Sequence, residues 1–472
     1  MKANRLFILL LFLMSAIKML ADRVDTTAIV NLNMPVLHIS TINAEEPTCD
    51  FVFPPEGAFG ISITNAVKVP GRALLTLRKD TLFDSGPYEE KTSGMTIKIR
   101  GNTSAYYYNK KPYKIKLQKK GDMLHRGDKR FNDKDWLLIC DGDDNFNVMI
   151  GLKMSELMGL GWTPAYEYVN LIMNGEYRGI YMLIESVDRN ADCRINVDKN
   201  TGYLIERDAY WWNEDVYFST TMNKEYTFKY PDDDDVTQEQ IDYIKGVMDT
   251  VENALADGTY PDYIDVNSFA SWLLAHDILG TYDSGGSNIY LTKYDNTEDS
   301  KVQMATLWDF SSDMKTVNDW ARIHYDFFYF KELSDDPNTY FTYVFKKIWN
   351  ERSDSVFNGV KTFLTDFLQS KKAQNLTIAR VYDHYQWNIN SSVTVEDNIN
   401  AALTWFDNRR EWLDKAIDNL EVNTMHIENT AVNHPTVNNG VYNLQGQRVG
   451  ATSPRPLPPG IYIRKGKKFV VR

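Results

Sequence analysis

Three oxygen-bearing side chains stand where a metal-dependent phosphoryl transfer could use them. Asp283 and Asn288 are the two ends of the stretch "DSGGSN", and Asp309 lies in "WDF" after a second apolar run. This Asp–Asn spacing is that of a catalytic loop which positions an attacking hydroxyl and a divalent metal ion. Carboxylate and amide oxygens are the ligands that Mg²⁺ prefers. The pattern therefore predicts that Asp283 orients or deprotonates the hydroxyl, and that Asn288 and Asp309 hold the metal.

Phosphoryl transfer also needs a cation on the phosphate groups. Lys114 and Lys116 alternate with apolar residues in "YKIKL", so both lysines lie on one face of an expected strand. Glu156, in a helix expected over 147–160, is a candidate ion-pair partner for them. Plainer interpretations are an exposed strand face for the lysines, a solvent-facing glutamate, and an Asp–Asn spacing that arose by chance. The order along the chain (lysine, glutamate, hairpin, helices, then Asp, Asn and Asp) favours a nucleotide site.

Composition limits the class of protein. The 472 residues are 43% hydrophobic and 13% aromatic, which predicts two or three packed domains rather than a disordered chain. A net charge of −12 argues against a nucleic-acid partner, which would need a basic face. The three cysteines (Cys49, Cys140 and Cys193) match no zinc or redox motif, and their odd number leaves at least one thiol outside any internal disulfide. Neither an H-E-x-x-H nor a G-x-S-x-G motif supports a hydrolase.

The two ends of the chain differ from its middle. Lys2 and Arg5 precede an apolar run that ends shortly before Ala21, a pattern typical of a secretory signal peptide over residues 1–21. No later stretch has the 18 apolar residues of a membrane span, so the mature chain is expected to have none. Residues 426–472 contain three short strand patterns between Gly- and Pro-rich turns, and we expect a small separate β-domain there.

Between these ends, strand patterns dominate residues 34–210 and helical patterns dominate residues 211–422. The clearest strand signal is a hairpin over 166–187, where Asn174 and Gly175 supply a turn with positive φ. Apolar residues at three- and four-residue spacing predict helices over 237–255 and 267–279, and further helices near 338–351, 354–371 and 398–420.

Several blocks of this sequence resemble the spore coat protein H (CotH) kinase family over about residues 34–315. They are "IKIRGNTS", "KKPYKIKLQKK", "KDWLL", "LGWTPAYEYVNLIMNGEYRGIYMLIESV", "GYLIERD", "VNSFASWLLAHDI" and "WDF", of which "RGN" and "NGEYRG" are the most specific. The resemblance implies an α+β, atypical protein-kinase-like bilobal fold, with a β-rich N-lobe and a helical C-lobe. It also implies transfer of phosphate from ATP to Ser or Thr of proteins with Mg²⁺ or Mn²⁺. The family's catalytic Asp falls on Asp283 and its metal-binding Asp on Asp309.

The chain departs from the family pattern at three places. The helix after "KDWLL" lacks the usual Arg, the nearest positions being Ile150 and Gly151, and His276-Asp277 replaces an Asn-Glu pair. After "WDF" the usual acidic residue and later Gly become "SSDM" (311–314). Loss of a phosphate-binding Arg would weaken nucleotide binding. A second hypothesis is therefore a catalytically inactive, kinase-like binding or structural protein of the cell surface.

The tail resembles the C-terminal sorting domain of type IX secretion substrates in Bacteroidetes. The resemblance rests on "VYNLQGQRV", "LPPGIYI" and "KKFVV" in that order. It implies export machinery as a partner and, together with the signal peptide, a secreted or cell-surface location.

Overall fold

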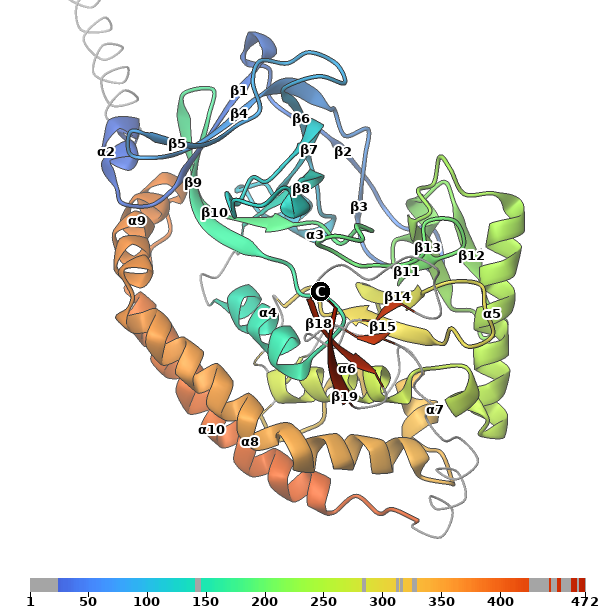
Figure 1. Cartoon of the computed structure of the whole chain (residues 1–472). Coiled ribbons are helices and arrows are strands. Elements are labelled where there is room, and N and C mark those ends of the chain that lie inside the picture. The colour runs from blue at the N-terminus through green and yellow to red at the C-terminus, as the bar shows by residue number, and fades with distance from the viewer. Residues whose placement is uncertain are drawn as a thin grey trace, which may run out of the picture.

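A computed structural model shows a mixed α+β protein with two main sheets and a layer of long helices (Figure 1). The predicted signal peptide (1–21) and the candidate Asp283 lie outside the described residues. Those residues are 24–140, 146–281, 286–310, 314, 317–324, 329–423, 441–442, 448–450, 460–464 and 467–471.

The larger sheet closes on itself. Strand β1 pairs in parallel with β9 and antiparallel with β4, so seven strands form a ring and β5 extends it at β4. Alternate apolar side chains of these strands, such as Ile97, Ile115 and Leu138, fill the interior as one core. The strands in sheet order are β1 (Val36–Thr41), β9 (Tyr166–Met173), β10 (Glu176–Glu185), β8 (Asp133–Ile139), β7 (Tyr113–Gly121), β6 (Met95–Ile99), β4 (Val69–Leu77) and β5 (Asp80–Asp84).

The predicted hairpin is confirmed as β9–β10, with Asn174 and Gly175 at φ values of 51° and 81°. The same block contains Gly179, where the register shifts and φ is 98°. A Cβ on Gly179 would lie 2.0 Å from Oδ1 of Asp383, in helix α9 (Lys371–Trp387). That oxygen accepts hydrogen bonds from the Ile180 amide and from Nζ of Lys110, each at 2.8 Å. The "NGEYRG" block is therefore the place where α9 docks on the sheet.

A second, five-stranded sheet lies beside the first, and two short strands form a separate hairpin. The strands of the five-stranded sheet, in order, are β12 (Tyr217–Ser219), β13 (Glu225–Tyr230), β11 (Tyr203–Arg207), β14 (Ile289–Lys293) and β15 (Val302–Thr306). Strand β11 ends before the predicted boundary at residue 210, whereas its partners β13 and β14 follow that boundary. The predicted division into 34–210 and 211–422 therefore cuts through this sheet. The hairpin consists of β2 (Asp50–Val52) and β3 (Ser62–Thr64).

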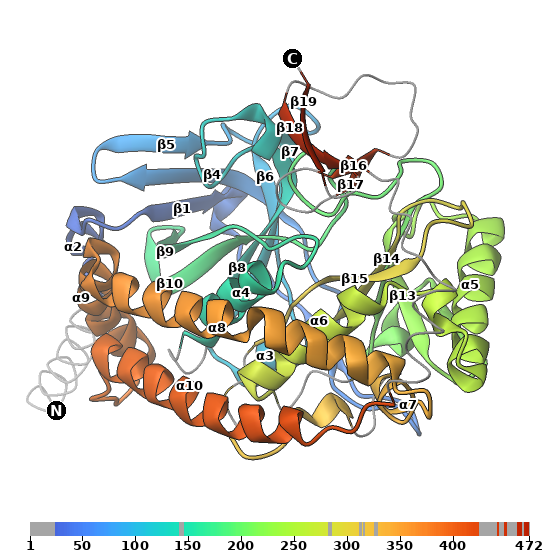
Figure 2. The same ribbon diagram turned by 60° about the horizontal axis from the view of Figure 1, so that its bottom comes forward.

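Helices α8 and α10 lie side by side along one side of the molecule, whereas α5 lies beside the second sheet (Figure 2). Two helices predicted near 338–351 and 354–371 are one continuous helix, because the polar run "NERSDS" contains no Gly or Pro to break it. Helix α9 was not predicted, although Ser370 caps it by accepting a hydrogen bond from the Ala373 amide. The helices are α2 (Thr26–Asn31), α3 (Thr103–Tyr107), α4 (Asn147–Met158), α5 (Gln238–Asp257), α6 (Val266–Leu279), α7 (Phe330–Ser334), α8 (Tyr340–Gln369), α9, and α10 (Val395–Asp418).

The tail forms a sheet of its own, in the order β17-β16-β18-β19. Its strands are β16 (Val441–Tyr442), β17 (Arg448–Gly450), β18 (Gly460–Arg464) and β19 (Lys467–Val471), one more than the sequence predicted. None of the three cysteines forms a disulfide. Within the described part of the chain, every helix is too short or too polar to cross a membrane.

Candidate functional site

The structure brings two of the predicted site residues together. Asn288 lies just before β14 and Asp309 just after β15, and these strands pair antiparallel, with Tyr290 opposite Thr306. The pairing places the two residues at the same edge of the five-stranded sheet, where Nδ2 of Asn288 donates a hydrogen bond of 3.1 Å to Oδ2 of Asp309. Asp309 is exposed to solvent. The edge thus presents an amide and a carboxylate that a metal ion in solvent could reach.

Both residues adopt the left-handed backbone conformation, with φ values of 61° at Asn288 and 62° at Asp309. Among residues other than glycine, Asn and Asp adopt this conformation most readily, because their short polar side chains hydrogen-bond locally. Each residue thus turns the chain sharply at its end of the β14–β15 hairpin. The conformation and the oxygen donors together explain why these two residue types occupy these two positions.

Asp309 is flanked by buried aromatic residues that fix its place. Trp308 and Phe310 are 8% and 1% exposed, and Phe310 packs directly on Gly151 of α4. A Cβ at Gly151 would lie 2.1 Å from Cδ1 of Phe310, so no side chain fits at this position without moving the ring. The structure thereby accounts for Gly151, close to the position where the family usually carries an arginine.

The described end of the "DSGGSN" loop is tied to the second sheet. Oγ of Ser287 donates a hydrogen bond of 3.1 Å to Oδ1 of Asp208, a buried residue that follows β11. A Cβ on Gly286 would lie 3.2 Å from Cζ of Phe59, in the loop between β2 and β3. The loop that begins at Asp283 therefore ends between the β2–β3 hairpin and the second sheet.

A buried polar network ties the segment after Asp309 to the end of α6. Asp277, which is fully buried, accepts a hydrogen bond from the Ala321 amide at 2.9 Å and lies 2.7 Å from Nε2 of His324. Arg409 of α10 is also fully buried and donates hydrogen bonds to the Asp277, Val317 and Asp319 carbonyls at 2.6–2.7 Å. Burial lowers the pKa of the Arg409 guanidinium to about 10. Asp277, a position at which the chain departs from the family, thus joins the end of α6 to residues 321–324, and Arg409 joins both to α10. We call Asp277 and Arg409, with these hydrogen bonds, the buried clamp.

Sequence reasoning missed Arg409, the other half of the clamp. The signal that could have found it is its place on α10, where it shares the buried face with apolar residues such as Phe406 and Leu413. A charged residue on such a face must have polar partners inside the protein. The neighbouring His276 is also fully buried, and burial lowers its pKa to about 3, so the imidazole is neutral at physiological pH.

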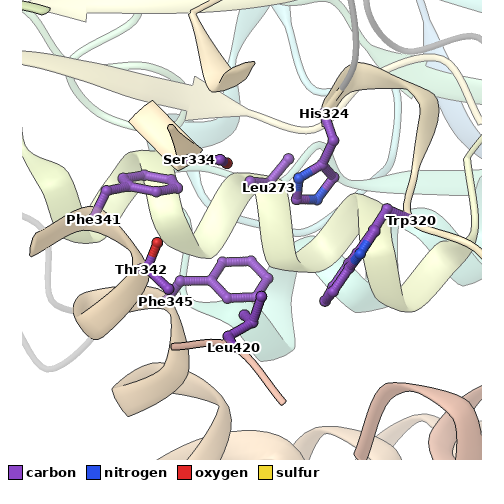
Figure 3. A pocket seen from close by; sticks show the side chains of 8 residues that line it. All are labelled: Leu273, Trp320, His324, Ser334, Phe341, Thr342, Phe345 and Leu420. Carbon is purple, nitrogen blue, oxygen red and sulfur yellow. The ribbon is translucent and has the colours of Figure 1, made fainter. Parts of the chain in front are cut away.

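A pocket of about 140 Å³ lies beside this clamp (Figure 3). Its walls are mainly apolar, and none of them is a predicted site residue. They are Leu273, Trp320, His324, Ser334, Phe341, Thr342, Phe345 and Leu420. The pocket is therefore distinct from the edge formed by Asn288 and Asp309.

The predicted pairing of a lysine with Glu156 is wrong. Nζ of Lys114 lies 2.9 Å from Oδ1 of Asp135 on the neighbouring strand β8. The Glu156 side chain is 64% exposed and pairs with Lys153 at 3.0 Å, one turn away on the same helix. Glu156 lies on the outer face of α4, because the opposite face packs into the main core. Lys116 is exposed and lies directly across from Asp135 in the strand register.

Asp135 also belongs to a buried acidic cluster that the sequence did not reveal. Single oxygens of Asp133, Asp135 and Asp188 lie within 4.8 Å of one another. The Arg194 side chain is completely buried and places its nitrogens 3.7 Å from Asp133 and 3.9 Å from Asp188. Burial, and next the charge of Asp135, raise the pKa of the Asp188 carboxyl to about 6. Asn190 donates a further hydrogen bond of 2.6 Å to Asp133.

Comparison with known proteins identifies the family. No curated protein matches the sequence. Two solved structures show weak likeness at 12% identity: the Helicobacter pylori proinflammatory kinase CtkA and the Shewanella oneidensis toxin–antitoxin system HipA–HipB with its operator DNA. The first match covers 63% of this chain and 92% of that chain with a TM-score of 0.24, and the second covers 62% of each with 0.25. Scores this low carry no argument. The model of the family described as CotH kinase protein, however, matches residues 97–421, more than half of the 472-residue sequence. The chain therefore belongs to the CotH kinase protein family.

Proposed function

We propose that this protein is a secreted or cell-surface kinase that transfers phosphate from ATP to Ser or Thr of proteins with Mg²⁺ or Mn²⁺. The observation that carries the proposal is the contact between Asn288 and Asp309 at one exposed sheet edge. Side chains 21 positions apart meet there, and they supply the oxygen donors that a magnesium–nucleotide site needs. Membership of the CotH kinase family supports the same chemistry.

Each residue of the proposed site has its own role in phosphate transfer. Asp283, five positions before Asn288 in the sequence, orients the substrate hydroxyl and accepts its proton as the hydroxyl oxygen bonds to the terminal phosphorus of ATP, the bond to the bridging oxygen breaks and ADP leaves. Asn288 and Asp309 would hold the divalent ion, because their amide and carboxylate oxygens fit such a hard cation. When bound there, the ion would neutralise charge on the transferring phosphate. Lys114 and Lys116 contribute positive charge from the first sheet, and the buried clamp of Asp277 and Arg409 positions the segments that flank the site.

The test is phosphate transfer by the purified full chain. With Mg²⁺ or Mn²⁺ and γ-labelled ATP, we expect label on the protein itself or on an added protein substrate. Asp309→Ala removes a metal ligand that is worth several kcal/mol, so we expect the rate to fall by a factor of roughly 100 or more. The matched control is Asp366→Ala, which removes an exposed carboxylate from α8 and should leave the rate unchanged.

The second candidate function is a catalytically inactive, kinase-like binding or structural protein of the cell surface. Two observations favour it: Lys114 is engaged by Asp135, and Gly151 leaves no space for a side chain close to the family's arginine position. The scarcity of ATP outside cells points the same way. Absence of label, together with no shift of the melting temperature on adding ATP and metal, would leave this function standing.

We further propose export through the two ends of the chain. The signal-peptide pattern at 1–21 and the four-stranded tail sheet support this route. In cells of the source organism, deletion of 426–472 should keep the protein out of the surface and extracellular fractions. Delivery of the truncated chain to the surface would refute a sorting role for the tail.

A further inference from the structure

The β2–β3 hairpin is held at its base by two asparagines that come from different parts of the chain. Oδ1 of Asn102, at the start of α3, accepts hydrogen bonds from the Ser62 hydroxyl at 3.1 Å and from the Ile63 amide at 3.2 Å. Nδ2 of Asn213, in the 3₁₀ helix η3 (Trp211–Asn213), donates hydrogen bonds of 3.0 Å to the Ser62 hydroxyl and to the Ile63 carbonyl. Strand β3 therefore has a fixed position between α3 and η3.

Aromatic side chains gather where this hairpin lies beside α3 (Figure 1). The ring centroids of Phe51 and Phe53 lie 5.1 and 6.3 Å from that of Tyr106, and the rings of Tyr106 and Tyr107 are 4.9 Å apart. Each pair meets edge to face, which is a favourable arrangement for aromatic rings. Phe53 and Tyr107 are nevertheless 64% and 67% exposed. We call these four residues the aromatic patch. Exposed apolar groups that adjoin one another mark interaction sites on soluble proteins.

The loop of the same hairpin reaches the proposed metal site. Phe59 lies in this loop and is 60% exposed, and a Cβ at Gly286 would lie 3.2 Å from its Cζ. Gly286 is two positions before Asn288. The next residue of the loop, Gly60, packs on Tyr210, whose Cε1 would lie 2.6 Å from a Cβ at this glycine. One hairpin therefore contacts the chain next to Asn288 with its loop and contributes to the aromatic patch with its first strand.

This surface carries little charge. The hairpin and α3 contain two charged side chains, those of Asp50 and Glu56, whereas 25% of the whole sequence is charged. Lys111, four residues after α3, is engaged by the Ala105 carbonyl at 2.6 Å. A strongly charged partner would thus find little countercharge on these elements. Aromatic faces and tyrosine hydroxyls suit an uncharged, extended segment that contains proline, because such a segment is already ordered before it binds.

We propose that the aromatic patch and Phe59 dock an uncharged, proline-containing segment of the protein substrate beside its phosphoacceptor Ser or Thr. The proposal rests on the proposed function and makes the substrate class more specific. The continuity of the surface carries it, because a substrate chain that reaches the edge at Asn288 meets Phe59 first and the patch next. The hairpin precedes residues 97–421, which the family model matches, so this assignment adds to the chemistry that the family implies.

The test measures binding of the labelled full chain to an array of immobilised peptides in which one position at a time is fixed around a central serine. The wild type should select proline and aliphatic residues and reject charged ones. Phe53→Ser and Tyr107→Ser should weaken binding by a factor of about ten or more, as expected for aromatic anchors of an interface. Tyr107→Phe keeps the ring and should retain most of the binding.

The melting temperatures of the serine variants should equal that of the wild type, because both side chains are mainly exposed. Tyr263→Ser is the matched control. It makes the same change at a tyrosine that is 42% exposed in the turn between α5 and α6, and it should leave peptide selection unaltered.

Peptide binding needs neither ATP nor metal, so its outcome is separate from that of the proposed function. A wild type that binds no peptide or selects charged residues would overturn the inference, as would selection that Tyr107→Ser leaves unchanged. A dimer that Tyr107→Ser dissociates in analytical ultracentrifugation would overturn it in favour of a second copy of this chain. Retention on an uncharged polysaccharide gel that only the patch variants lose would overturn it in favour of a sugar. A wild type that selects proline-containing peptides but transfers no phosphate would uphold the docking surface and remove the kinase.

Discussion

The buried acidic cluster and the Asn288–Asp309 edge are both candidate metal sites, but they differ in what surrounds the carboxylates. The cluster of Asp133, Asp135 and Asp188 brings one oxygen of each of three carboxylates within 4.8 Å of the others, a spacing that could hold a metal ion. Its interior already contains the buried guanidinium of Arg194, and the ammonium of Lys114 lies at its margin. The edge offers a single carboxylate and an amide, but Asp309 is exposed to solvent.

The difference shows that a count of carboxylates does not identify a metal site. Three acids around one arginine form a charge network that fixes the loop after β10 against β8, because Arg194 also donates hydrogen bonds to Ser186 and to the Asp135 carbonyl. A catalytic metal needs a coordination position that substrate can reach, and Asp309 at the edge is exposed whereas Asp133 and Asp135 of the cluster are buried. We therefore assign a structural role to the cluster.

The largest expected effect comes from removing the cation of the cluster. Arg194→Ala leaves buried carboxylates without their partner, which typically costs about 3–5 kcal/mol in the free energy of unfolding. Chemical denaturation measures this loss. Arg130→Ala is the control, because that side chain is 69% exposed and solvent screens its pair with Asp128. A metal role for the cluster would show as a wild type that Mg²⁺ alone stabilises strongly and an Arg194→Ala protein that Mg²⁺ restores.

A smaller effect, of opposite sign, is expected at Asp188. Its folded-state pKa of about 6 lies above the value of about 3.8 for an unfolded chain, so the native state favours the protonated form. The stability that this carboxyl contributes is fully present below about pH 4 and is lost as the pH rises through 6. Asp188→Asn keeps a neutral side chain at every pH. We expect the variant to match the wild type near pH 4 and to be more stable by about 1–3 kcal/mol above pH 7.

Denaturation curves between pH 4 and 8 measure this difference directly. The gap between the two proteins should open between pH 4 and 6 and then stay constant. An Asp188→Asn protein that is less stable than the wild type at pH 7 would contradict the assignment, since it would mean that the carboxylate is needed in its charged form.

The sequence was informative where function depends on local chain geometry. Asn288 and Asp309 flank one hairpin, so strand patterns and two polar residues at their ends sufficed to predict that they are neighbours. The turn at Asn174-Gly175 was predictable for the same reason. Each of these features is decided by residues within one or two strands.

Features that depend on strand register or on helix orientation were not predictable from the sequence. The expected partner of Lys114 was wrong because periodicity places Glu156 on a helix but does not decide which face of α4 meets the sheet. The true partner, Asp135, follows from the pairing of β7 with β8. Arg409 is 132 positions from Asp277, and only the packing of α10 brings them together.

The smallest expected effect is that of removing Asn288, which is the weaker of the two proposed metal ligands at the edge. Asn288→Gly removes the amide while a φ of 61° remains accessible, so the backbone turn should persist. Because Asp309 keeps its carboxylate, we expect Mg²⁺–ATP affinity to fall only by a factor of about ten, equivalent to about 1.4 kcal/mol. Calorimetry measures the affinity, and Asp188→Asn serves as the matched change at the other acidic site, where it should leave affinity unaltered. If Asn288→Gly bound Mg²⁺–ATP as tightly as the wild type while Asp188→Asn bound it more weakly, the roles of the two sites would be reversed. The metal would then belong to the buried acids, and the exposed edge would only shape the turn.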